Sequence, residues 1–311
     1  MYNFDDIIGN ENIVKSLRAA ISRGHIGHAY IVSGASGSGK KLLALAFAKA
    51  VLCESKGTAA CNFCTSCKTL EAGSHPDVVY VRPTKKSMGI DDIREQVLEG
   101  AAVMPYSSDR RVFIIQDADL MTVSAQNALL KTLEDGPKYA VFVLLAQNSD
   151  VFLPTITSRC VTYKTQPLAD AVVQNYLVAQ GIGREAAETA ASHAAGSIGR
   201  GMMLAADEDF AALRITISGL ADSLDDKGIP AVFEAAKLLE KHKERIGDVL
   251  DMLCLFYRNI LVAECGEDDY AHGYVKAIVD NINIIDETRR KLNRNCNFLL
   301  TMEVMLLRLK R

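Results

Sequence analysis

The chain has 311 residues, of which 49% are hydrophobic and 23% charged, and its formal net charge is −3. This is a globular composition with room for two or three domains, and the charge argues against a protein that coats nucleic acid, although a local basic face stays open. The first residues lack a basic stretch followed by an apolar run, and no segment offers about 18 uninterrupted apolar residues. We therefore expect a cytoplasmic protein without a signal peptide or membrane span.

A glycine-rich loop follows the first predicted strand, at residues 28–33, and precedes a predicted helix at 41–51. The loop reads Gly-Ala-Ser-Gly-Ser-Gly-Lys, which matches the first seven positions of the phosphate-loop pattern G-x-x-x-x-G-K-S/T. Glycines there let backbone N–H groups converge on phosphate oxygens, and the lysine reaches the terminal phosphates. The candidate phosphate-binding residues are Gly34, Gly37, Gly39 and Lys40.

The eighth position of the pattern is anomalous. Lys41 stands where serine or threonine should supply a hydroxyl to Mg²⁺. A lysine cannot ligate the metal and adds a positive charge beside it. We expect the phosphate cradle to survive and magnesium-dependent hydrolysis to be impaired, and the sequence leaves nucleotide binding open.

Four bunched cysteines follow this helix, in the spacing Cys-x7-Cys-x2-Cys-x2-Cys. In a reducing compartment this pattern is typical of a metal site, and four thiolates make a closed, tetrahedral, structural Zn²⁺ site. An iron–sulfur cluster is the chemical alternative, and free or redox-active thiols are the third interpretation. His75 is a substitute ligand that we expect to be structural. The candidate ligands are Cys53, Cys61, Cys64 and Cys67.

Three more apolar strands are predicted, at 78–81, 112–115 and 141–145, with a helix at 123–133 between the last two. Continuous apolar strands that alternate with helices indicate a parallel sheet covered on both faces.

The strand at 112–115 resembles a Walker B strand, which ends in an acidic pair that holds Mg²⁺ and polarises water. If the apolar runs are aligned, Gln116 falls on the metal-binding acid and Asp117 on the catalytic one. If Asp117 is instead the first acid, Ala118 replaces the second. The pair is incomplete in both registers, so two independent defects predict little ATPase activity.

The character of the chain changes after Pro167. Residues 168–207 are alanine-rich with short helical periods, and beyond 208 apolar residues follow one helical face at 249–261 and 298–309. We predict an α/β fold in three parts: a nucleotide-binding-like domain at 1–166 with a metal module around 53–67, a small helical domain at 167–207, and a helical bundle at 208–311.

Four motifs together resemble the bacterial clamp-loader family of AAA+ proteins, and the resemblance covers nearly the whole chain. They lie at residues 4–9, 28–30, 127–134 (Asn-Ala-Leu-Leu-Lys-Thr-Leu-Glu) and 153–160 (Leu-Pro-Thr-Ile-Thr-Ser-Arg-Cys). The resemblance implies an AAA+ domain with a zinc module, a helical lid and a helical collar. It also implies that backbone near Ile8 and Gly9 lies beside the adenine of ATP or ADP.

The motif Ser158-Arg159-Cys160 is similar to the family's arginine finger, which enters the ATP site of the neighbouring subunit. A guanidinium there stabilises charge on the transferring phosphoryl group, an effect of roughly 10³ to 10⁵ in rate. The alternative is a surface arginine in a structural ion pair. Asn148, beside Gln147, matches the sensor 1 region and Arg200 lies near the sensor 2 position, and the alternative for both is a solvated loop residue.

The resemblance implies a subunit of the DNA polymerase III holoenzyme that lends Arg159 in trans while the complex loads the sliding clamp onto primed DNA. Its partners would be gamma/tau and delta subunits, the sliding clamp and, through the complex, primer-template DNA. One alternative is a catalytically active gamma/tau-type ATPase. Another is a zinc-dependent nucleic-acid-binding module, which would bind DNA alone in a salt-sensitive way.

Overall fold

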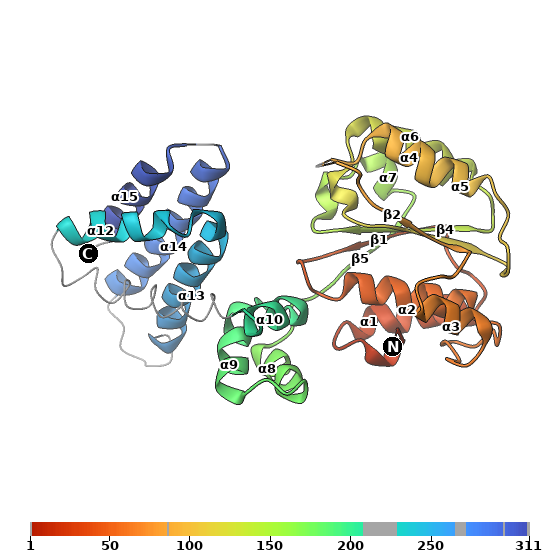
Figure 1. The fold of residues 1–311 in the computed structure, drawn as a ribbon, viewed down its shortest axis with the longest axis horizontal. Coiled ribbons are helices and arrows are strands. Elements are labelled where there is room, and N and C mark those ends of the chain that lie inside the picture. Colours follow the sequence, from red (N-terminus) through yellow and green to blue (C-terminus); the bar gives the residue numbers. More distant parts are fainter. Residues whose placement is uncertain (1, 86, 208–228, 265–271, 295, 310–311) are drawn as a thin grey trace. The chain divides into compact units, whose positions relative to one another are not determined.

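The computed structural model describes residues 2–85, 87–207, 229–264, 272–294 and 296–309 (Figure 1). Contacts between Cα atoms divide the chain into two compact units. The first comprises Met1–Gln180 and Ala195–Arg200, and the second comprises Gly181–Ala194 and Gly201–Arg311. The expected division into three domains stays a prediction, and its boundary at 208 lies outside the described residues.

The first unit contains a five-stranded sheet in the order β2-β3-β4-β1-β5, and every neighbouring pair is parallel. The central strands β4 and β1 are buried along their whole length, which explains why both appear in the sequence as continuous apolar runs. Since all five strands run the same way, the loops that leave their carboxyl ends meet at one edge. The strands are β1 (Ala29–Ser33), β2 (Val78–Val81), β3 (Arg111–Ile115), β4 (Ala140–Ala146) and β5 (Val161–Lys164).

Helices cover both faces of this sheet (Figure 1). One face packs against η1 (Phe4–Asp6), α1 (Glu11–Ser22) and α2 (Lys40–Leu52), with α3 (Thr65–Glu71) beside α2. The other face packs against a continuous helical stretch made of α4 (Ile90–Ile93), η2 (Arg94–Leu98) and α5 (Glu99–Ala101), and against α6 (Val123–Asp135) and α7 (Pro154–Thr157). The predicted parallel sheet covered on both faces is confirmed.

Short elements complete the first unit. These are η3 (Ala118–Leu120) after β3, η4 (Ser149–Val151) after β4, and α8 (Asp170–Ala179). The start of α10 (Ile198–Ala205) also belongs to this unit through residues 195–200.

The second unit is helical throughout its described residues. Helix α13 packs on α14, and α15 packs on both α12 and α14, around buried side chains such as Leu253, Ile285 and Leu306. The helical faces expected at 249–261 and 298–309 are confirmed. Its elements beyond α10 are α9 (Arg184–His193), α12 (Ile229–Glu240), η5 (Lys243–Arg245), α13 (Ile246–Glu264), α14 (His272–Asn293) and α15 (Phe298–Leu309). Among the described helices, none has the length and apolar character that a membrane crossing requires.

Candidate functional site

The glycine-rich loop leaves the carboxyl end of β1, beside the centre of the sheet, and leads into α2. Gly37 and Gly39 have φ angles of 72° and 84°, a region that glycine adopts without strain. Gly39 is the N-cap of α2, so the unpaired N–H groups of the first helical turn face the loop. The loop therefore has the backbone that an anion cradle requires, and its phosphate-binding role stays a prediction.

A polar cavity of about 310 Å³ opens beside this loop. It is lined by the loop itself, by Lys40 and Lys41 from the start of α2, by Gln116 and Asp117 from the end of β3, and by Gln147 after β4. The structure thus gathers the two anomalous positions, Lys41 and Gln116, in one place. Three adjacent strand ends supply this cavity.

Lys40 lies across the loop that precedes it. Its Nζ donates to the carbonyl oxygens of Gly34 at 2.6 Å and Ala35 at 2.7 Å. Burial lowers the pKa of Lys40, while the negative charges of Asp119 and Asp117 act in the opposite direction. The ammonium group is therefore fixed at the rim of the cradle.

The residues of the polar cavity do not fit a catalytic Mg²⁺ ion. Mg²⁺ takes oxygen ligands, which phosphate loops supply from a Ser or Thr hydroxyl and from a strand-end aspartate. Lys41 and Gln116 occupy those two positions, and among the described residues Asp117 is the one carboxylate that lines the cavity. The amide Nε2 of Gln116 is buried without a hydrogen-bond partner, and this neutral side chain supplies none of the negative charge of a strand-end aspartate.

An apolar cavity of about 210 Å³ adjoins the polar one and shares Gly37 and Gly39 with it. Ile7 and Ile8 line it, together with side chains from α2, from α8 and the residues before it, and from α10: Leu42, Leu168, Tyr176 and Ile198. Gly9 lies next to it with a φ of 70°, and a Cβ there would stand 2.3 Å from Leu168 Cδ2. The neighbourhood expected for adenine therefore contains an apolar hollow.

The start of α10 packs closely on the phosphate loop. The N–H of Gly199 donates to the carbonyl of Gly37 at 3.0 Å, and a Cβ on Gly199 would stand 2.8 Å from Gly37 Cα. The hydroxyl of Ser197 donates to the carbonyl of Ser36 at 2.9 Å. Arg200 follows this contact, and its expected sensor 2 role stays a prediction.

The two sensor 1 candidates differ in position. Gln147 lines the polar cavity. Asn148 does not line it, because its Oδ1 accepts the backbone N–H of Asp150 at 3.0 Å and caps η4. A contact between Asn148 and nucleotide stays a prediction.

Arg159 follows α7 and forms an ion pair within the chain. Its Nη2 lies 2.7 Å from Oε1 of Glu134, and its Nη1 donates to the carbonyl of Thr155 at 2.9 Å. The Arg159 and Glu134 side chains are 36% and 44% exposed, and pairs between such exposed groups contribute only about 0–1 kcal/mol. The structural alternative for this arginine is thus realised in the isolated chain, at a strength that leaves the guanidinium easily released.

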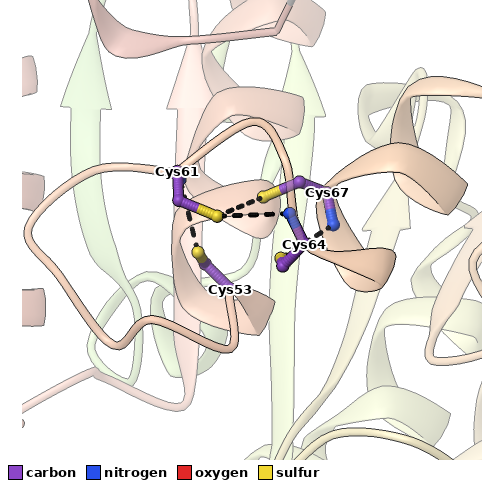
Figure 2. Close-up of side chains that lie close together, drawn as sticks. All are labelled: Cys53, Cys61, Cys64 and Cys67. Atoms are coloured by element: carbon purple, nitrogen blue, oxygen red, sulfur yellow. Dashed lines mark hydrogen bonds between the residues drawn. The ribbon is translucent and has the colours of Figure 1, made fainter.

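The four bunched cysteines converge from the end of α2, the following loop and the start of α3 (Figure 2). Their sulfur atoms all lie within 4.8 Å of one another, and Cys61 Sγ lies 4.0 Å from Cys67 Sγ. Four sulfurs at about 2.3 Å from a tetrahedral Zn²⁺ would be about 3.8 Å apart, so the cluster fits such an ion.

Backbone donors make this cluster suitable for thiolates. The N–H groups of Cys61, Cys64 and Cys67 each donate to the sulfur of the preceding cysteine of the cluster, at 3.3–3.4 Å. Burial raises the pKa of the Cys61 thiol, but hydrogen bonds, among them those from the backbone of Phe63 and Cys64, outweigh it and lower that pKa to about 6. A metal-binding thiol must lose its proton, and these donors favour the charged form.

His75 and Lys49 support the cysteine module from outside the ligand set. His75 is 4% exposed; its Nδ1 accepts the N–H of Asp77, so its Nε2 donates to Ser66 Oγ at 2.8 Å. Lys49 lies one turn before Cys53 and is 0% exposed. Its Nζ donates to Asn62 Oδ1 at 2.8 Å and to Glu71 Oε2 at 3.0 Å. Asn62 lies in the loop between α2 and α3, here called the metal loop, and Glu71 is the last residue of α3. Lys49 was not predicted, although a lysine within an otherwise apolar helical run is a visible signal.

Asp77 is a second residue that sequence reasoning missed. It is 0% exposed and accepts hydrogen bonds from the N–H groups of Tyr106, Ser107 and Ser108 and from the Ser107 hydroxyl. Burial raises the pKa of Asp77, but these four donors outweigh it and hold that pKa below its usual value. They fix the loop that carries the exposed side chains of Val103, Met104 and Tyr106.

Comparison with known proteins gives consistent matches. The family model described as "DNA polymerase III, delta subunit" matches residues 9–169. The chain is 29% identical over 317 residues to DNA polymerase III subunit delta' of Bacillus subtilis, covering 96% of this chain and 95% of that protein. It is also 29% identical over 316 residues to subunit tau of the same organism, of which it spans 54%. A crystal structure of a DNA polymerase III, gamma subunit-related protein from Thermotoga maritima is 19% identical, covers 95% of this chain and 98% of that one, and has a TM-score of 0.46.

Proposed function

Because the chain belongs to the clamp-loader family of DNA polymerase III subunits, we propose that it serves as the delta-prime subunit of a bacterial clamp loader. In this role it joins gamma/tau and delta subunits, in the cytoplasm, and supports ATP-dependent loading of the sliding clamp onto primed DNA. Its AAA+ domain contributes to the active site of a neighbour and hydrolyses little or no ATP itself.

The observation that carries this proposal is that Lys41 and Gln116 both line the polar cavity. Both replace groups that hold Mg²⁺ in active phosphate-loop enzymes, and they approach the same cavity from separate elements. A gamma/tau-type ATPase, the alternative within the family, needs a working magnesium site. The presence of both residues in one cavity therefore supports a delta-prime role over a gamma/tau role.

Arg159 supports the same role because it could act in the ATP site of another subunit. Its ion pair with Glu134 joins two partly exposed groups, so a partner that offers phosphate charges can compete for the guanidinium. An arginine that leaves its own chain for the γ-phosphate of a neighbour would stabilise the transferring phosphoryl group there. Head-to-tail contacts of this kind are heterologous, with different surfaces on the two sides.

The cysteine module has a structural role in this proposal. Four converging thiols with their backbone donors leave no open ligand position, so a bound Zn²⁺ would fasten an insertion that lacks a core of its own. The zinc ion of this module would therefore take no direct part in ATP hydrolysis.

Reconstitution with gamma/tau and delta subunits tests the proposed trans role. Arg159→Ala should leave assembly intact and lower the ATPase stimulated by clamp and primed DNA at least about tenfold, because a finger contributes roughly 10³ or more at the site it serves. Arg159→Lys should not restore activity, since an ammonium lacks the planar fork of donors. Arg94→Ala removes another exposed arginine, paired with Asp91 at 3.9 Å, and serves as the matched control.

The outcomes separate the alternatives. An Arg159→Ala complex that assembles and hydrolyses ATP at the wild-type rate rules out the trans role. Steady magnesium-dependent hydrolysis by the isolated chain favours the gamma/tau alternative. Salt-sensitive DNA binding by the isolated chain favours a nucleic-acid-binding module.

A further inference from the structure

The polar cavity that does not fit Mg²⁺ retains the groups that bind phosphate. Lys40 and Lys41, in the first turn of α2, line it together with the phosphate loop. Gln116 contributes a neutral amide to the lining, where a carboxylate would repel phosphate.

The charge in the cavity matches that of a metal-loaded site. An active phosphate-loop site holds one lysine, a divalent cation and two carboxylates, so its net charge is +1. The charged side chains among the described residues that line this cavity are two lysines and one aspartate, which gives the same net charge without a metal ion. Lys41 replaces the charge that magnesium would supply, and Gln116 removes the carboxylate that magnesium would neutralise.

We propose that this cavity binds the phosphates of a nucleoside di- or triphosphate without a divalent metal ion. Lys40 and Lys41 neutralise the phosphate chain, and the neutral Gln116 leaves the cavity without the carboxylate that would repel it. The inference does not depend on the trans role of Arg159, which concerns a different surface of the chain.

The adjoining apolar cavity indicates a nucleoside rather than free phosphate. It shares Gly37 and Gly39 with the polar cavity, so one ligand can place its phosphates in the polar cavity and its aromatic base in the apolar one. Ile8 and Tyr176 are among the apolar side chains that would contact the base. Apolar walls with a few polar groups at one end are typical of small-molecule sites.

Calorimetric titration of the full chain with ADP, with Mg²⁺ or with EDTA, tests the proposal. We expect ADP to bind in EDTA at least as tightly as in Mg²⁺, and pyrophosphate to bind at least tenfold more weakly than ADP. Absence of binding up to millimolar ADP, or binding at least tenfold tighter with Mg²⁺, would overturn the proposal. Pyrophosphate binding as tight as ADP binding would overturn the assignment of a nucleoside ligand.

Two variants separate metal-free binding from nucleotide binding in general. Lys41→Met should weaken ADP binding in EDTA by about tenfold or more, because it removes a charged hydrogen bond to phosphate. The double variant Lys41→Thr with Gln116→Asp should bind ADP at least tenfold tighter with Mg²⁺ than with EDTA. Lys15→Met, at an exposed lysine of α1, should match the wild type. Equal binding by wild type and Lys41→Met in EDTA would contradict the role of Lys41, and because Lys41 is exposed, misfolding does not obscure the result.

Discussion

Replacing Asp77 by asparagine should destabilise the first unit without changing its shape. The four hydrogen bonds to Asp77 are divided between its two oxygens, with Tyr106 N–H on Oδ1 and three donors on Oδ2. An asparagine keeps one oxygen, and its NH₂ group must face N–H donors on the other side. At least one buried backbone donor therefore loses its acceptor.

The magnitude follows from these contacts. A buried donor left without a partner costs about 1–3 kcal/mol, and each remaining hydrogen bond weakens when its acceptor becomes neutral. The variant also avoids the penalty of burying a charge, which offsets part of this loss. We expect Asp77→Asn to lower the free energy of unfolding by about 2–3 kcal/mol.

Urea unfolding of the full chain, combined with amide hydrogen exchange at residues 106–108, measures this loss. Asp109→Asn is the matched control, because Asp109 pairs with Lys56 at the surface, where the two side chains are 79% and 75% exposed. That variant should leave the free energy of unfolding nearly unchanged, because exposed ion pairs contribute little to stability. If Asp77→Asn destabilises no more than Asp109→Asn, or exchange at 106–108 is unchanged, the reasoning is wrong.

The loss should also depend on pH in a defined direction. Burial raises the pKa of Asp77, but its four donors outweigh burial and hold the pKa in the folded state below the unfolded value of about 3.9. The ionised carboxylate therefore stabilises the fold fully above about pH 5, and this contribution is lost as the pH falls through the lowered pKa. The difference between wild type and Asp77→Asn should shrink below about pH 4, and a difference that grows there contradicts this assignment.

The remaining predictions concern the cysteine module. Protein purified without chelator should contain about one zinc ion per chain by elemental analysis, and Cys67→Ser should remove it; a wild-type chain with neither zinc nor iron contradicts a metal site. Lys49→Met should lower zinc affinity about 10–100-fold in a competition titration with a chromogenic chelator, because it releases the contacts with the metal loop and with Glu71. Lys68→Met, at an exposed lysine of α3, should leave zinc affinity unchanged, and equal affinity for both variants would exclude a bracing role for Lys49.

The sequence predicted four strands of the sheet, among them the edge strand β2, and missed the other edge strand, β5, for a physical reason. Strands β1, β3 and β4 lie inside the sheet, so burial on both faces requires continuous apolar residues that are visible in the sequence. Strand β5 pairs only with β1, and three of its four residues are exposed, so its sequence, Val-Thr-Tyr-Lys, carries no such run. Its pairing with β1 is set by tertiary contacts.

The candidate site was likewise predicted only where its residues are close together in the sequence. The phosphate loop and the cysteines are contiguous in sequence, so their spacing alone predicted a loop and a ligand cluster that the structure brings together. The partners of Asp77 lie about 30 residues further along the chain, and Glu134 lies 25 residues before Arg159. No local pattern specifies contacts of this kind, because they depend on how the intervening elements pack.

The contact between Gly37 of the phosphate loop and Gly199 at the start of α10 constrains how the cavity could be changed by substitution. Lys41→Thr and Gln116→Asp would restore the hydroxyl and the carboxylate that hold magnesium in active phosphate-loop enzymes. Position 199, one residue before Arg200, stays closed to every side chain while a Cβ there would stand 2.8 Å from the Cα of Gly37. A residue with a side chain at position 199, an arginine included, would therefore require the backbone of the phosphate loop to move. Any substitution at this position would thus be transmitted to the loop itself.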